Sequence, residues 1–365
     1  MKILCDRALL QETFGIIGSV VPAKSAKPIL QSVLVTADDD GISLFATDLE
    51  IAAKARIDSV KVSKQGQVLL PAREFAALLR ELSEATVTLQ SKDGRCNVES
   101  GGGTFVLLGE EPDQFPGDIK SGSGKGIKLE AGRLLRMIQE TSFAAAREET
   151  RYAINGVMMD YGGGCLRLVA TDGRRLALSY ENLDAGKHEF KVVVPLRALS
   201  TLSRAIPDGS KEELTVSVSD KQVQFSFGSV EIITQQLESR FPDYEAVVPK
   251  AADTTVELDH AILESSLRKT AILCADDLRM VRFEVDDTNL RLTTESNSRG
   301  RADVIMDVVS KGAGGPISFN PDYILEALRV CEEETVRLDM IDDSMPAKFT
   351  LGESFTYVVM PISGT

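Results

Sequence analysis

Four arginines recur at a fixed interval and are the residues of this chain best placed to bind an anion. Arg73 and Arg197 are 124 positions apart, and so are Arg80 and Arg204. Arg80 follows Arg73 by seven residues, which places both side chains on one face of a helix after about two turns. Guanidinium groups bind phosphate oxygens well, but charged residues also form the ordinary solvated face of an amphipathic helix. The spacing alone leaves both interpretations open.

Carboxylates recur in the same way but do not form a catalytic set. Asp48 and Asp172 are also 124 positions apart, and matching positions in two repeats favour a turn or cap role over general acid–base catalysis. His188 and His260 are too distant in sequence to suggest a local metal site. The chain lacks a phosphate-binding loop, a dinucleotide glycine motif, a zinc-protease motif and a serine nucleophile elbow. We expect no catalysis, no metal and no cofactor.

The interval of about 124 residues organises the whole chain. An alternating apolar strand recurs three times, as Ile42, Leu44 and Ala46, then Leu166, Leu168 and Ala170, then Leu290, Leu292 and Thr294. A repeat of this length can bury its own core, so it indicates three similar domains in tandem rather than a solenoid. The side-chain-poor stretch 121–126 marks the first boundary. We predict domains at residues 1–120, 121–250 and 251–365.

Each predicted domain contains two helices and several strands. Apolar residues at three- and four-residue spacing predict helices at 6–15, 131–141 and 258–270, and a second set beginning at Pro71, Pro195 and Pro321, where proline suits a first helical turn. Period-two runs predict strands between them, and the glycines at 101–103 predict a tight hairpin. Runs of strands without strict βαβ alternation indicate an α+β fold with antiparallel sheets.

The distribution of charge bears on the choice of partner. The chain has 365 residues and a formal net charge of -14, which by itself argues against nucleic-acid binding. The six predicted helices together carry about +1, so the rest of the chain carries the whole acidic excess. An acidic exterior with a mildly basic helical face suits a protein that surrounds DNA without gripping it, because tight phosphate binding would slow its release.

The cysteines and the N-terminal sequence indicate the cellular compartment of the protein. Five scattered cysteines without a CxxC pair suggest reduced thiols. The N-terminus lacks the layout of a signal peptide, and no apolar stretch is long enough to span a membrane. We expect a cytoplasmic protein.

Several phrases in this chain resemble the bacterial DNA polymerase III beta subunit family, the replicative sliding clamps. The phrases stand in the order of that family at residues 46–50 (ATDLE), 151–156 (RYAING), 170–177 (ATDGRRLA), 240–244 (RFPDY) and 357–361 (YVVMP). The resemblance runs essentially end to end. It implies three domains of the DNA-clamp fold in a head-to-tail homodimeric ring around double-stranded DNA, with helices inside and sheets outside.

The resemblance also implies partners and an absence of catalysis. Such a ring tethers the DNA polymerase III catalytic subunit and other proteins with a clamp-binding motif, and an ATP-dependent clamp loader opens it. Processivity then comes from effective concentration rather than tight DNA contact.

Site residues carry over from the family position by position. The partner-peptide cleft between the second and third domains would be lined by Ile154, Thr171, Gly173, Arg174, Arg175, Leu176, Pro242, Val247, Pro346, Val358, Met360, Pro361 and Ile362. The aliphatic residues would accept apolar anchors, Gly173 would admit close backbone approach, and the two arginines would receive a peptide carboxylate or carbonyl. Glu245 and Ala246 stand where relatives often place arginine.

Two further sets follow from the same resemblance. DNA would face Lys24, Arg73, Arg80, Arg151, Tyr152, Arg197 and Arg204. Ring closure would bring Phe105 of one subunit against Ile272 and Leu273 of the other. Two alternatives remain open: a protein scaffold of the same fold that has lost DNA binding, suggested by the acidic charge, and a hydrolase that uses Asp48 or Asp172.

Overall fold

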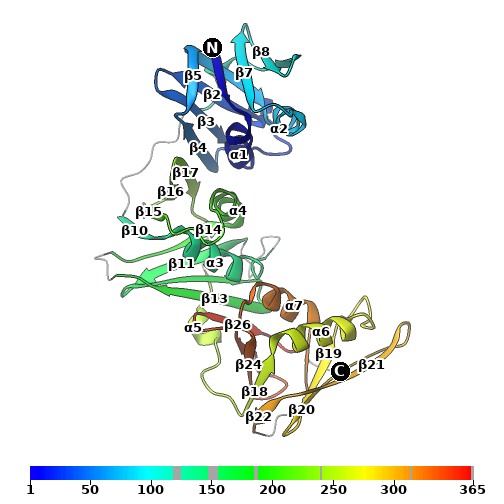
Figure 1. Ribbon diagram of the computed structural model, residues 1–365. Coiled ribbons are helices and arrows are strands. Elements are labelled where there is room, and N and C mark those ends of the chain that lie inside the picture. The colour runs from blue at the N-terminus through cyan, green and yellow to red at the C-terminus, as the bar shows by residue number, and fades with distance from the viewer. Residues whose placement is uncertain (118–124, 147–154, 185–187, 239–240, 313–314, 363–365) are drawn as a thin grey trace. The chain divides into compact units, whose positions relative to one another are not determined.

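The computed structural model describes residues 1–117, 125–146, 155–184, 188–238, 241–312 and 315–362. Within these ranges the chain folds into three copies of one arrangement, in which two helices accompany two antiparallel sheets (Figure 1). The α+β class is therefore confirmed.

The six predicted helices are all present. The helices are α1 (Arg7–Gly18), α2 (Ala72–Glu81), α3 (Ala131–Ser142), α4 (Leu196–Ala205), α6 (His260–Ala271) and α7 (Pro321–Val330), with a short α5 at Tyr244–Val247. The side chains of Asp6 and Asp259 cap α1 and α6 by accepting a hydrogen bond from the third backbone N–H that follows each of them. None of the helices in the described ranges combines the length and the apolar content needed to cross a bilayer.

The role expected for the helix-leading prolines is wrong in two of three cases. Pro321 is the first residue of α7, as expected. Pro71 and Pro195 instead end the strands before α2 and α4, where they pair with Ser32 and Gly156. Both strands lie at the edge of their sheets, where the missing proline N–H breaks no ladder.

The first domain contains nine strands in two groups. They are β1 (Lys2–Asp6), β2 (Ser32–Asp38), β3 (Gly41–Thr47), β4 (Ile51–Ile57), β5 (Val60–Lys64), β6 (Gly66–Pro71), β7 (Thr86–Lys92), β8 (Arg95–Ser100) and β9 (Gly103–Leu108), with 3-10 turns at Pro28–Gln31 and Pro112–Gln114. One sheet has the order β5-β1-β7-β8-β9, and the other group has the order β4-β3-β2-β6. The predicted glycine hairpin joins β8 to β9.

The other two domains repeat this pattern. The middle domain has β10 (Lys125–Glu130), β11 (Gly156–Gly162), β12 (Cys165–Thr171), β13 (Arg175–Asn182), β14 (Phe190–Pro195), β15 (Glu213–Val218), β16 (Gln222–Phe227) and β17 (Val230–Gln235). The third has β18 (Thr254–Asp259), β19 (Val281–Val285), β20 (Asn289–Ser296), β21 (Gly300–Asp307), β22 (Val309–Lys311), β23 (Ile317–Phe319), β24 (Thr335–Met340), β25 (Ala347–Thr350) and β26 (Phe355–Val359).

Sheets run continuously from one domain into the next. β17 of the middle domain pairs with β4 of the first, and β26 of the third pairs with β13 of the middle domain. We call these pairings the first and second junctions. By contacts, the chain therefore forms two compact units, Met1–Leu135 with Arg197–Gln236, and Arg136–Leu196 with Leu237–Thr365. Each unit holds one junction, and the middle domain is shared between them.

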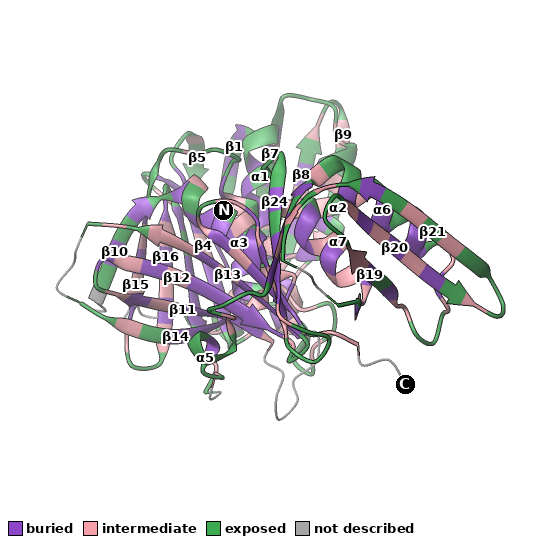
Figure 2. Ribbon diagram, turned by 90° about the horizontal axis from the view of Figure 1, so that it is seen from below, coloured by how far each residue is buried: buried purple, intermediate pink, exposed green. Residues whose placement is uncertain are grey.

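The core of each domain lies between its helices and its sheets. Side chains alternate between buried and partly exposed along many strands, for example β15 and β16 (Figure 2). In the first domain, Phe14 of α1 and Phe75 of α2 meet edge to face with ring centroids 4.8 Å apart. The amphipathic pattern of the helices therefore buries their apolar faces, while Arg73, Arg80 and Arg204 stay exposed.

Candidate protein-binding and nucleic-acid interfaces

A turn at the start of β13 forms the centre of the candidate partner site. The Thr171 hydroxyl donates to the Arg175 carbonyl and accepts from the N–H of Gly173. One carboxylate oxygen of Asp172 accepts from the N–H groups of Arg174 and Arg175. Gly173 has φ 86°, a conformation that glycine adopts without steric cost. The carboxylate of Asp172 thus serves the turn, as its recurrence in the sequence indicated.

The two arginines of this turn have different surroundings. Arg174 is exposed, and the nearby Tyr323 hydroxyl is the main reason that its pKa is raised. Arg175 is buried, and its guanidinium donates to Asp172, to Glu326 and to the Phe143 carbonyl. The expectation that both arginines receive a partner's carboxylate therefore fits the geometry best for Arg174, because Arg175 is buried and each of its three guanidinium nitrogens already donates within the chain.

The apolar part of the site surrounds one buried cluster in the second unit. Its members are Met158, Val169, Leu176, Val193, Tyr244 and Val358, with Leu178, Leu237, Phe241 and Val248 packed against it. Among the residues carried over from the family, Leu176 and Val358 belong to this cluster and Thr171 is also buried, whereas Val247 and Met360 are 38% and 41% exposed. Exposed apolar side chains over a buried apolar floor suit the anchors of a short peptide.

Backbone pairing holds the rim of the site in place. The N–H of Met360 donates to the Arg174 carbonyl, and the N–H of Ile362 donates to the Ser318 carbonyl. Pro346 and Pro361 are half-buried and Pro242 is exposed. Ala347 pairs with Val359, so the segment before β25 lies beside the end of β26. Ile154 lies outside the described residues.

Four contributors to the site were missed from the sequence. The Tyr244 hydroxyl donates to Asp160 at 3.1 Å, and the Lys191 ammonium lies 5.2 Å from the Tyr244 ring centroid. Burial raises the pKa of Tyr244, and the Asp160 carboxylate adds to this effect. Met345, beside Pro346, is 44% exposed. Tyr244 ends the RFPDY phrase and could have been found there, but Met345 carries no local signal.

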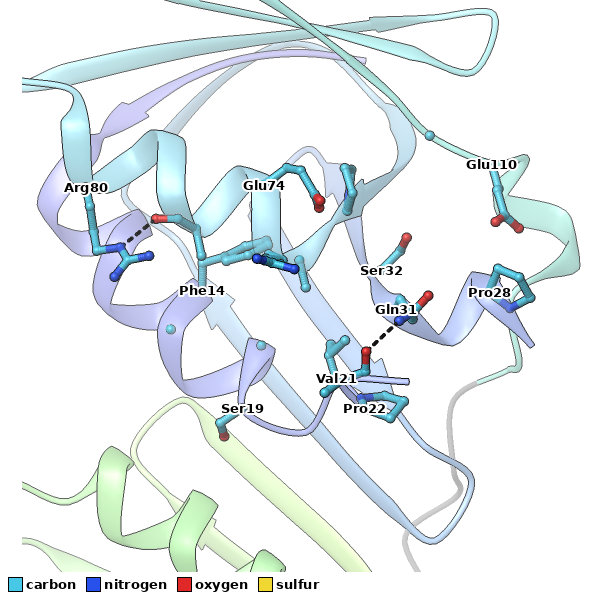
Figure 3. Close-up of a pocket in the computed structure, with 18 of the residues that line it drawn as sticks. Phe14, Ser19, Val21, Pro22, Pro28, Gln31, Ser32, Glu74, Arg80 and Glu110 are labelled. Carbon is cyan, nitrogen blue, oxygen red and sulfur yellow. Dashed lines mark hydrogen bonds between the residues drawn. The ribbon is translucent and has the colours of Figure 1, made fainter. Parts of the chain in front are cut away.

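Three of the predicted DNA-facing arginines line one groove in the first unit. Arg73, Arg80 and Arg204 border a hollow of about 900 Å³, together with Glu74 and Glu110 (Figure 3). Its wall is built from α1, α2 and the segment after β9. Mixed charge along this surface gives a mild rather than a strong attraction for phosphates.

The remaining predicted DNA contacts differ in exposure and in the interactions that already hold their side chains. Lys24 is exposed in the loop before the 3-10 turn at Pro28. Arg197 donates to the Asp48 carboxylate and to the Val20 carbonyl, and its side chain stays 43% exposed. Arg151 and Tyr152 lie outside the described residues.

The residues predicted for ring closure lie on exposed apolar surface. Phe105 on β9 is 40% exposed, and its strand neighbours Val106 and Leu108 are 53% and 70% exposed. Ile272, the residue after α6, is 67% exposed, and Leu273 beside it is half-buried. Each of the two units thus presents exposed apolar side chains at the residues predicted for ring closure.

Among the described residues, no group of three or more histidine, cysteine, aspartate or glutamate side chains could hold a metal ion. The structure offers binding surfaces built from a repeated sheet-and-helix unit, with exposed arginines on the helices and apolar strand edges. These features define a protein of the clamp fold.

The comparisons with known proteins agree with this class. Models of the N-terminal, central and C-terminal domains of the DNA polymerase III beta subunit match residues 1–119, 128–243 and 245–363. The beta sliding clamps of Salmonella typhimurium and Escherichia coli K12 are 31% and 30% identical over 365 residues, covering 99% of this chain and 100% of each relative. The chain therefore belongs to the DNA polymerase III beta subunit family. Its similarity to beta sliding clamps over the full length supports its assignment as a replicative sliding clamp.

Solved structures show the same fold over the full length. The Thermotoga maritima DNA polymerase III beta subunit is 26% identical, with a TM-score of 0.94 and 100% coverage of both chains. A DNA polymerase III beta subunit from Pseudomonas aeruginosa is also 26% identical, with a TM-score of 0.92 and the same coverage. The three-domain architecture predicted from the repeat is therefore confirmed.

Proposed function

We propose that two copies of this chain close head to tail into a ring around double-stranded DNA and act there as a processivity factor without catalysis. The observation that carries the proposal is a pair of unpaired strand edges. β9 ends one sheet of the first domain, and β21 ends one sheet of the third. Exposed edges of this kind present unpaired N–H and C=O groups to another chain.

The strand pairings at the two junctions within the chain are a template for a third pairing, between two copies of the chain. At the first junction, Ile232 of β17 stands opposite Ala53 of β4. At the second, Tyr357 of β26 stands opposite Ala177 of β13. In both cases the last strand of one domain pairs with the fourth strand of the domain before it. β9 and β21 hold these same two places in the first and third domains, so each can serve the other in a second copy.

The template also gives a register for ring closure. Phe105 pairs with Val98 inside its own sheet, as Ile232 and Tyr357 pair with phenylalanines in theirs. Ala302 pairs with Thr294, in the place of Ala53 and Ala177. We therefore expect Phe105 of one subunit to stand opposite Ala302 of its partner. A heterologous contact of this kind closes into a ring when its rotation allows.

DNA would pass the helices without tight contact. Arg80 and Arg204 border the same groove and are exposed, and the loop residue Lys24 adds a third cation. The rest of the chain carries the acidic excess, which limits the number of phosphates that can be neutralised at once. The ring would then slide, and an ATP-dependent clamp loader would open it.

Partners would bind at the site formed by the turn at Gly173 and the apolar cluster below it. We propose that the polymerase III catalytic subunit, the loader and other proteins carrying a short apolar motif share this site. Exposed Val247 and Met360 would receive the apolar anchors, and Arg174 would meet a carboxylate or carbonyl. The tethered polymerase gains processivity from its raised local concentration at the primer end.

Retention on circular DNA tests the ring. The protein is loaded onto nicked circular duplex by a compatible clamp loader and ATP, and the circle is then cut at one site. We expect retention on the intact circle and release on linearisation. A circle cut before loading, with both ends blocked by bound protein, is the matched control and should retain the protein. Retention on free-ended linear DNA would contradict topological binding.

The acidic charge of -14 favours one second candidate, a protein scaffold of the same fold that does not encircle DNA. Replacement of Lys24, Arg80 and Arg204 by glutamate separates the two. The ring predicts weaker loading and lower polymerase processivity in this triple variant, whereas unchanged values of both would remove these residues from the DNA-lining set and favour the scaffold.

A further inference from the structure

The second helix of each domain begins with a matched stretch of residues whose surroundings differ. Arg73 is the second residue of α2, and Arg197 is the second residue of α4. Ala77 and Thr201 are the sixth residues of the same two helices. Both pairs are 124 positions apart, so any contact made by α4 has a counterpart position on α2.

At the first junction this stretch of α4 contacts the end of α1. The Arg197 guanidinium donates to the carbonyl of Val20, the second residue after α1. The hydroxyl oxygens of Ser19 and Thr201 are 3.1 Å apart. The start of α4 thus locks the middle domain onto the segment that follows the first helix of the preceding domain.

At the second junction, different residues make a similar contact between the second helix of one domain and the segment after the first helix of the preceding domain. Glu326, the sixth residue of α7, accepts from the Arg175 guanidinium. The same guanidinium donates to the carbonyl of Phe143, the first residue after α3. At both junctions, an arginine therefore donates a hydrogen bond to a backbone carbonyl just after the first helix of one domain. The sixth residue of the next domain's second helix also makes a contact there, Thr201 with Ser19 and Glu326 with Arg175.

The corresponding stretch of α2 has no such neighbour inside the first unit. Arg73 is exposed and makes no hydrogen bond or ion pair with the described part of the chain. Ala77 is exposed, whereas Thr201 is buried. The matching segment after α6 begins with Ile272, which is 67% exposed. Among the described residues, the first domain therefore has the helix of this contact without a partner segment, and the third domain has the segment without a partner helix.

We propose that Arg73 is a ring-closure residue, which donates to a backbone carbonyl at Ile272 or Leu273 of a second copy while Ala77 packs against Ile272. The inference rests on the proposed ring and moves Arg73 from the DNA-facing set to the subunit interface. The position of Arg73 supports it, because the groove that it borders also includes Leu108 and Glu110 at the end of the unpaired strand β9. Arg80 stays in the DNA-facing set.

Subunit dissociation distinguishes the two roles. The dimer dissociation constant is measured by dilution of dye-labelled protein for wild type, Arg73→Ala and the matched control Arg80→Ala. We expect Arg73→Ala to raise it about tenfold or more, as loss of a charged hydrogen bond at an interface does, and Arg80→Ala to leave it unchanged. An unchanged constant for Arg73→Ala would overturn the inference. A wild type that is monomeric at every concentration would instead refute the ring.

A disulfide tests the same contact without removing a charge. Because Ser19 and Thr201 nearly touch, the double variant Ala77→Cys with Ile272→Cys should form a covalent dimer under mild oxidation. Ala76→Cys with Ile272→Cys is the matched control, since residue 76 lies on a different face of α2, and it should stay uncrosslinked. Failure of the first pair to crosslink in a wild-type-like dimer would contradict the contact. In rings that are loaded first and crosslinked afterwards, Arg73→Ala should leave polymerase processivity at the wild-type value; a lower value would return Arg73 to DNA binding.

Discussion

The turns at the two junctions have the same backbone hydrogen bonds, and the difference that bears on partner binding is at their third position. Thr47 and Asp48 make the same hydrogen bonds in the first turn as Thr171 and Asp172 make in the second. The third position of the first turn is Leu49, with φ 82°, where the second turn has glycine with φ 86°. The fold therefore imposes this conformation on either residue.

The residue at this third position decides whether an incoming peptide can reach the backbone of the turn. A leucine at positive φ is strained, because its Cβ approaches the following carbonyl. Leu49 is also 42% exposed, so an incoming chain would meet its side chain at this turn. Glycine at the second turn leaves the backbone open to an incoming peptide. We infer that the chain offers its partner site at the second junction and not at the first.

The arginines next to these turns differ in burial, and this gives the largest expected effect. Arg175→Ala removes a buried guanidinium and leaves the Glu326 carboxylate without its partner, so we expect a loss of about 3 kcal/mol in the free energy of unfolding. Arg197→Ala removes an arginine that is 43% exposed, and the Asp48 carboxylate, 9% exposed, keeps two backbone N–H bonds, so we expect a smaller loss of about 1–2 kcal/mol. Urea denaturation followed by circular dichroism measures both.

Arg175→Lys is the control for charge, since lysine cannot reproduce the branched donor geometry and should recover only part of the loss. Equal destabilisation by Arg175→Ala and Arg197→Ala would mean that the two junctions are held in the same way after all.

Exchange of the turn residues gives the next largest effect. Gly173→Leu builds the first turn into the second, and we expect it to weaken binding of a peptide that carries the polymerase's clamp-binding segment by about tenfold or more, because the side chain covers the approach to the backbone. Isothermal titration calorimetry measures the affinity. Leu49→Gly is the matched control and should leave it unchanged. Full affinity in the Gly173→Leu variant would show that the peptide does not approach this turn.

The sequence predicted what depends on local pattern and missed what depends on distant partners. Helix spacing and the 124-residue repeat were enough for three tandem α+β domains, and the family resemblance supplied the clamp fold. The burial of Arg175 was not visible, because Glu326 lies 151 positions away and only the second junction brings them together. Pro71 likewise reads locally as a helix start, whereas its pairing with Ser32 makes it the end of a strand.

The residue roles carried over from the family show the same limit. Arg73 and Arg80 stand seven positions apart on one helix and share a chemical type, so the sequence places them in one group. Only the contacts of Arg197 at the first junction indicate a separate role for Arg73. A repeat therefore carries functional information that a single motif does not, because one copy shows in place the contact that another copy leaves open.

Relief of strain at Leu49 gives the smallest effect and tests the comparison most directly. Left-handed backbone costs leucine about 1–2 kcal/mol, while glycine adds about 0.5–1 kcal/mol of unfolded-state entropy. Leu49→Gly should therefore raise the free energy of unfolding by about 0.5–1 kcal/mol, although leucine to glycine is destabilising at most exposed positions. Leu49→Asn, which also tolerates this conformation, should raise it in the same direction. A fall in stability with both variants would mean that the exposed leucine contributes contacts that outweigh its strain, and the two turns would then differ in packing rather than in openness to a partner.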